Sequence, residues 1–118
     1  MTRYAILLIL LAMGCSAGRD DGNYMGRLSA AGQIKSVNQA DQVYYEISLD
    51  AAGANRPDIV MQALRGIKSV NIRDQAAVES VIMLCKAGNS KAAEEIAKGI
   101  STVQIRDQAM AHIATGKG

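Results

Sequence analysis

Ile67-Lys-Ser-Val-Asn-Ile-Arg-Asp-Gln-Ala76 is the stretch that decides the fold, because close copies of it stand at equal intervals before and after it. The earlier copy is Ile34-Lys-Ser-Val-Asn-Gln-Ala-Asp-Gln-Val43, and the later copy is Ile100-Ser-Thr-Val-Gln-Ile-Arg-Asp-Gln-Ala109, so the sequence has a 33-residue period. Each outer copy shares seven of its ten residues with the middle one. A fixed period of about 20–50 residues is typical of solenoids, in which one supersecondary unit stacks on the next.

Each unit reads as two helices. A hydroxyl residue that suits a helix N-cap stands at the same place in every copy, at Ser36, Ser69 and Thr102. In the middle copy the segment 74–85 carries apolar residues with the spacing of one helical stripe, and a turn at 86–90 separates it from a second helix. We therefore expect an all-α fold over residues 24–118: a short α-α superhelix of about five helices with a 33-residue repeat.

Ala87-Gly88-Asn89 followed by Ala93, Ala97 and Ile100 resembles the turn and second helix of a tetratricopeptide repeat. The phrase Ile-x-Ser/Thr-x-x-Ile-Arg-Asp-Gln-Ala is similar to a segment between hairpins in degenerate members of that family. The resemblance covers about residues 24–115 and implies a tetratricopeptide-like α-α superhelix. The sequence departs from the family in its 33-residue period and in having alanine, as at Ala76, where the family has a large aromatic residue.

The N-terminus has the features of a secretory signal peptide. Arg3 gives a positive start, and the apolar run Ala5–Met13 is followed by Gly14. Nine residues of helix rise about 14 Å at about 1.5 Å each, which is too short for a hydrocarbon core of about 30 Å. We therefore expect residues 1–14 to be a signal peptide and not a membrane-spanning helix.

Ala12-Met13-Gly14-Cys15 resembles the lipobox of bacterial lipoproteins. The resemblance implies cleavage before Cys15, a diacylglyceryl group on its sulfur and attachment to a membrane of the cell envelope. Ser16 follows, where an aspartate would imply inner-membrane retention, so a Gram-negative host would place the protein on the outer membrane, facing the periplasm. The alternative is an ordinary signal peptide with a cysteine near its cleavage site. Residues 15–23, small and polar after the cysteine, are expected to form a flexible spacer.

Composition narrows the function classes. Without residues 1–14 the chain has 104 residues, with 12 basic and 11 acidic side chains distributed along it. It has no Phe or Trp for stacking on bases and no basic cluster for phosphates, so nucleic-acid binding has no support. Neither a phosphate-binding glycine loop nor a nucleophile–base set is visible, and the single His112 has no metal-ligating neighbour at helical spacing. We expect no enzymatic activity, no cofactor and no metal.

Two charged pairs, Arg73-Asp74 and Arg106-Asp107, stand at equivalent places in the repeat. They are candidates for a surface that binds a partner, or for residues that support neighbouring helix ends. Recurrence favours support, because stacking must repeat in every unit and a binding site need not. Cys85 is expected to be a buried apolar residue, with a reactive thiol as the alternative.

Together, these features predict a membrane-anchored lipoprotein that acts as an interaction or assembly module in the bacterial envelope. Its partner would be an unidentified envelope protein or peptide, and the lipid on Cys15 would hold it at the membrane. The alternative is a structural, self-associating lipoprotein without a specific ligand, because incomplete repeats at both ends of the repeat region leave apolar faces uncovered.

Overall fold

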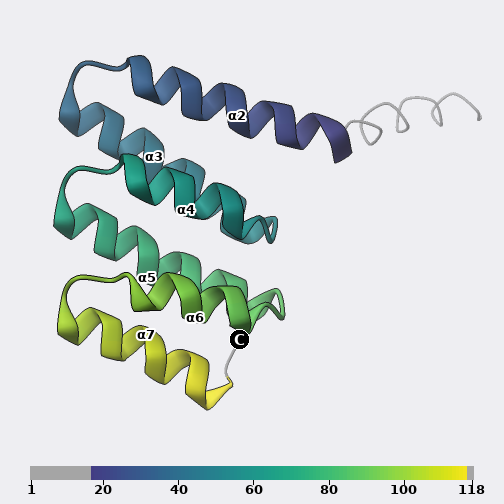
Figure 1. Cartoon of the computed structure of the whole chain (residues 1–118), viewed down its shortest axis with the longest axis vertical. Helices are drawn as coiled ribbons and strands as arrows, with labels where there is room; N and C mark the ends of the chain where they lie inside the picture. Colours follow the sequence, from purple (N-terminus) through teal and green to yellow (C-terminus); the bar gives the residue numbers. More distant parts are fainter. Residues whose placement is uncertain (1–16, 117–118) are drawn as a thin grey trace, which may run out of the picture.

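A computed structural model of the chain describes the backbone of residues 17–116 and the side chains of residues 23–116. This part of the chain is all-helical and contains no strand. Its helices follow one another along the long axis of a flat molecule, and each lies across that axis (Figure 1). They are α2 (Ala17–Gln33), α3 (Val37–Gly53), α4 (Pro57–Gly66), α5 (Val70–Lys86), α6 (Ser90–Lys98) and α7 (Val103–Thr115).

The helices divide into two alternating sets. The long helices α3, α5 and α7 form one set, in which α5 packs against both α3 and α7. Each short helix, α4 or α6, packs mainly on the long helix before it, and the two short helices touch each other little. Close packing in one set and wide spacing in the other leave an open groove between α4 and α6.

Six helices are present in the described residues, one more than the count of about five expected from the sequence. Two complete hairpins, α3–α4 and α5–α6, are flanked by α2 on one side and α7 on the other. Residues 17–23, assigned above to a flexible spacer, are instead the first turns of α2. The spacer assignment depends on polar residues and glycines, and a glycine in a helix costs only about 1 kcal/mol. The signal peptide (1–14) and Cys15 lie outside the described residues.

The ends of the long helices follow from their caps. Ser36 accepts a hydrogen bond from the backbone N–H of Gln39 at 3.3 Å, and Ser69 accepts one from that of Ile72 at 3.4 Å. Each bond satisfies one of the donors that a helix N-terminus leaves unpaired. Thr102 occupies the N-cap of α7, but its hydroxyl makes no such bond within the described residues.

Two turns need a left-handed backbone. Asn55 after α3 has φ 57°, and Gly88 after α5 has φ 81°. These are residue types that adopt positive φ with little strain. The two turns are also joined, because the Asn89 side chain donates a hydrogen bond to the Asn55 side chain at 2.7 Å.

The core consists mainly of small and branched apolar side chains from all six helices, with Tyr24 from α2 and with Ile100 from the loop before α7. Alanines at the contacts allow the helices to approach closely, and isoleucines and a leucine fill the remaining space. In the part of the chain that the structure describes, no helix combines the length and apolar character needed to span a bilayer. The largest fully buried apolar side chains are Ile47, Ile59, Ile67, Leu84, Ile100, Val60 and Val81.

Candidate functional site

Asp74, one of the charged residues singled out in the sequence, is a structural anchor for α7. Its side chain is only 1% exposed. One carboxylate oxygen accepts the backbone N–H of Ser101 at 3.2 Å, and the other accepts that of Thr102 at 2.9 Å. The Thr102 hydroxyl donates to the second oxygen at 2.7 Å, which explains why it does not cap its own helix. A carboxylate on α5 thus holds the start of α7.

The same arrangement occurs one unit earlier. Asp41 on α3 is 1% exposed and accepts the backbone N–H of Lys68 at 2.9 Å and that of Ser69 at 3.1 Å. The sequence reading missed this residue, because the neighbouring arginine of the later copies is Ala40 here. The available signal was the aspartate itself, which all three copies share.

The ionised form of Asp74 is favoured in the folded protein. Burial alone would raise its pKa, but hydrogen bonds from the Thr102 hydroxyl and from the backbone of Thr102 and Ser101 outweigh burial, and the charge of Arg73 adds to them. The net effect is a pKa below the usual value for an aspartate. Asp74 is therefore a buried, charged group whose carboxylate is already satisfied by three hydrogen bonds within the protein.

The other three residues of the two charged pairs differ from Asp74. Arg73 makes a long hydrogen bond of 3.5 Å to the Ser101 hydroxyl, and Arg106 donates to the backbone carbonyl of Ile100 at 3.4 Å. Both arginines are half-buried beside the loop before α7. Asp107 is exposed, and its carboxylate has no hydrogen-bonding partner among residues 23–116.

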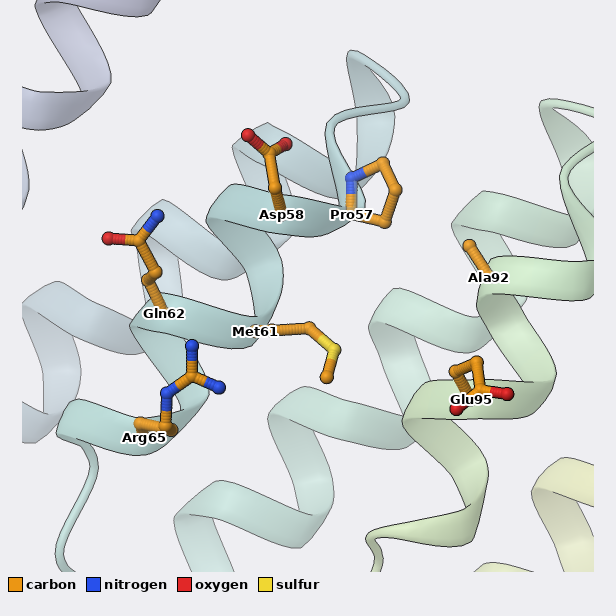
Figure 2. A pocket seen from close by; sticks show the side chains of 7 residues that line it. All are labelled: Pro57, Asp58, Met61, Gln62, Arg65, Ala92 and Glu95. Carbon is orange, nitrogen blue, oxygen red and sulfur yellow. The ribbon is translucent and has the colours of Figure 1, made fainter.

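The best candidate for a binding site is the open space between α4 and α6, here called the α4–α6 groove. Met61 reaches from α4 across this space toward α6, where Ala92 and Glu95 face it (Figure 2). A methionine suits the floor of such a site, because its flexible thioether adapts to varied partners. The groove has a volume of about 700 Å³, and its lining consists of Pro57, Asp58, Met61, Gln62, Arg65, Ala92 and Glu95.

The edge of the groove carries charges of both signs. Asp58 forms an ion pair with Arg56 at 3.1 Å, and this hydrogen-bonded partner lowers the pKa of Asp58. Glu95 on the facing helix lies 3.7 Å from Lys98, and Arg65 is exposed at the end of α4. These exposed ion pairs contribute little to stability, so their carboxylates can exchange partners at small cost.

A deeper hollow of about 370 Å³ continues the groove toward α5. It shares Met61, Arg65 and Glu95 with the groove. Apolar groups extend it, and Arg73 and Asp74, the first of the two charged pairs, also contribute to its lining. An apolar side chain of a ligand that enters between α4 and α6 therefore has further space beside Met61, next to α5. The additional apolar lining residues are Leu64, Ala77 and Ile96.

Two isolated residues do not form sites. Cys85 is half-buried and unpaired in the described residues, and burial raises the pKa of its thiol, which lowers its reactivity at neutral pH. His112 on α7 is half-buried, and its Nε2 atom has no hydrogen-bonding partner within residues 23–116. No group of three or more potential metal ligands exists among residues 17–116.

Comparison with protein families, with characterised proteins and with solved structures found no match to this chain. Its function is therefore inferred from the geometry of the α4–α6 groove and from the sequence.

Proposed function

We propose that this chain is a lipid-anchored interaction module of a bacterial cell envelope. In this proposal Cys15 carries the anchor, and the helices form a short α-α superhelix of 33-residue units. The α4–α6 groove binds a segment of another envelope protein. Support comes from the lipobox-like sequence before Cys15 and from the groove's mixture of apolar floor and charged edges.

The superhelical arrangement is supported by the recurring aspartate contact. Asp41 binds the backbone 27 and 28 residues later, and Asp74 does the same one unit further on. Matching backbone contacts in successive units are what the same step between α3 and α5 as between α5 and α7 would produce. A constant step between successive units is what generates a superhelix.

The single observation that carries the binding role is the position of Met61. It lies at the floor of an open groove between two helices that touch each other little. A partner side chain of the size of leucine that becomes buried there gains about 1.5–3 kcal/mol. The charges on Asp58, Arg65 and Glu95 can select the polar groups of the partner that flank it.

The test compares two charge reversals on the same helix. Glu95 lines the groove and Glu94 does not, although both are exposed glutamates of α6. The lipidated wild type, Glu95→Lys and Glu94→Lys proteins are used to recover partners from detergent-solubilised envelopes, with quantification of each recovered protein. We expect Glu95→Lys to lose a partner that wild type and Glu94→Lys retain. Equal recovery by all three proteins would contradict a role for the groove.

The anchor is tested separately with Cys15→Ser. This change removes the lipid-bearing sulfur and leaves residues 23–116 unaltered, so we expect the protein to leave the membrane fraction with its helical content unchanged. A Cys15→Ser protein that stays in the membrane fraction would contradict the lipid anchor while leaving the groove hypothesis intact.

A further inference from the structure

The two ends of the row of helices carry surfaces that the interior of the molecule buries. On α7, Asp107 is exposed, and Met110 and Ile113 are only partly buried at the edge of the core. Their equivalents in the preceding unit, Asp74, Ala77 and Ser80, are at most 4% exposed. We call the first three residues the trailing face. On α5, the equivalent side of the helix is covered by the helices that follow it.

At the opposite end, around the loop between α2 and α3, residues are partly exposed whose equivalents in the later units are buried. Ile34 and Val43 are half-exposed and line a hollow of about 460 Å³ together with Asn38, Gln39 and Gln42. Their equivalents in the later units, namely Ile67, Ala76, Ile100 and Ala109, are at most 2% exposed. We call Ile34, Gln39, Val43 and the backbone N–H groups of Lys35 and Ser36 the leading face.

Those two N–H groups are donors without an acceptor in residues 23–116. The equivalent donors, at Lys68 and Ser69 and again at Ser101 and Thr102, bind the carboxylates of Asp41 and Asp74. Within the described residues, the leading face thus lacks an aspartate, and the trailing face has an aspartate, Asp107, that lacks its pair of donors.

We propose that a second copy of this chain docks on the trailing face and that copies assemble head to tail. The Asp107 carboxylate of one copy accepts the backbone N–H groups of Lys35 and Ser36 of the next. The next copy's α2 then lies against α7, in the position that α4 takes on α3. This contact gives a specific form to the self-association anticipated from the sequence. The proposed contact between copies rests on the superhelical stacking proposed above and does not involve the α4–α6 groove.

Small residues on α2, next to the leading face, leave room for the larger side chains of the trailing face. On α2, Gly26 has no atom within 4 Å of where a side chain would begin, and Ala30 is exposed. Met110 and Ile113 are the large apolar groups that would pack on these small residues. Because the contact joins different faces of the two copies, it is heterologous, and it produces an open row unless the rotation between copies closes a ring.

The experiment uses the full lipidated chain in mild detergent, with micelles in excess over protein so that the lipid alone does not bring copies together. Sedimentation velocity over a concentration series measures association. Asp107→Lys removes the acceptor. Ser36→Pro replaces one donor with a ring carbon at a residue whose φ of −75° suits proline. Ser36→Ala loses the same hydroxyl but keeps the N–H, and Glu46→Lys is an exposed charge reversal on neither face.

We expect wild type, Ser36→Ala and Glu46→Lys to form oligomers larger than dimers. Asp107→Lys and Ser36→Pro should each associate at least about tenfold more weakly, which corresponds to about 1.4 kcal/mol. Mixing these two variants leaves one intact trailing face and one intact leading face, so the mixture should form one-to-one dimers and nothing larger.

Three results would overturn the proposal. The first is a wild type that stays monomeric at all concentrations. The second is an Asp107→Lys or Ser36→Pro protein that associates as strongly as wild type, and the third is the absence of a dimer in the mixture of these two variants. Circular dichroism first checks that Ser36→Pro is folded. If it is not, Gln39→Arg, which fills the hollow of the leading face, takes its place in the mixture with the same expected dimer. Partner recovery by Glu95→Lys is measured independently, so failure of one proposal does not entail failure of the other.

Discussion

Replacement of Asp74 by alanine tests the structural role of the repeated aspartate most directly. The change removes acceptors for two backbone N–H groups and one hydroxyl. Ser101 is exposed and Thr102 half-buried, so water can reach the freed donors, and each lost bond costs about 1 kcal/mol, the lower end of its range. We expect Asp74→Ala to destabilise the fold by about 3 kcal/mol.

The assay is urea unfolding at pH 7, followed by far-ultraviolet circular dichroism, at protein concentrations too low for association. With an m value of about 2 kcal/mol per molar, a loss of about 3 kcal/mol lowers the midpoint by about 1.5 M. Amide hydrogen exchange should also accelerate in α7 before the other helices, because the lost contacts hold the start of that helix.

The matched control is Asp107→Ala, which alters the same repeat position without removing a hydrogen bond within residues 23–116. Its effect on the monomer should stay within about 0.5 kcal/mol. Asp41→Ala should cost about 2 kcal/mol, because it leaves two backbone donors unpaired and removes no hydroxyl bond. Equal effects of the Asp74 and Asp107 changes would refute the reasoning, because burial and hydrogen bonding would then not determine the cost.

The remaining predictions concern pH, two glycines and a tyrosine. The pKa of Asp74 is lowered on folding, so its ionised carboxylate contributes fully to the free energy of unfolding above the unfolded-state pKa of about 3.9. This contribution is lost as pH falls through the folded-state pKa. The urea midpoints of wild type and Asp74→Asn should therefore converge in acid. Gly66→Ala should destabilise by about 1–3 kcal/mol, because a side-chain carbon there would meet the Tyr44 ring at 2.5 Å, whereas Gly26→Ala meets nothing and should stabilise slightly. Tyr45→Phe should cost about 1 kcal/mol, because it removes a 2.5 Å hydrogen bond from α3 to Glu79 on α5. Urea midpoints measure all of these changes, and a Gly66→Ala protein as stable as Gly26→Ala would show that the ring moves aside freely.

Much of the local structure could be predicted from the sequence, because helix formation depends on neighbours. The hydroxyl caps at Ser36 and Ser69 were predicted from their place in the repeat, and both make the expected bond. Apolar spacing in segment 74–85 likewise predicted one buried stripe, and Ala77, Val81 and Leu84 of α5 are buried. The start of α2 was not predicted, since polar composition and glycine discourage a helix without preventing one.

The candidate site was less predictable. Arg73 and Asp74 look equivalent to Arg106 and Asp107 in the sequence, yet Asp74 is 1% exposed and Asp107 is on the surface. The difference depends on whether a later unit packs over the residue, which no local pattern reports. Met61 likewise became a candidate only because α4 and α6 are spaced apart around it.

The sequence by itself determined the 33-residue period, the helical character and most of the apolar stripes. All of these depend on residues within one or two helical turns or on direct comparison of the copies. The tertiary structure alone decided that Asp41 and Asp74 hold backbone groups 27 and 28 residues away, and that a groove opens between two short helices. Such contacts form only after long helices stack and bring distant segments together, and burial then determines whether a carboxylate anchors a helix or faces the solvent.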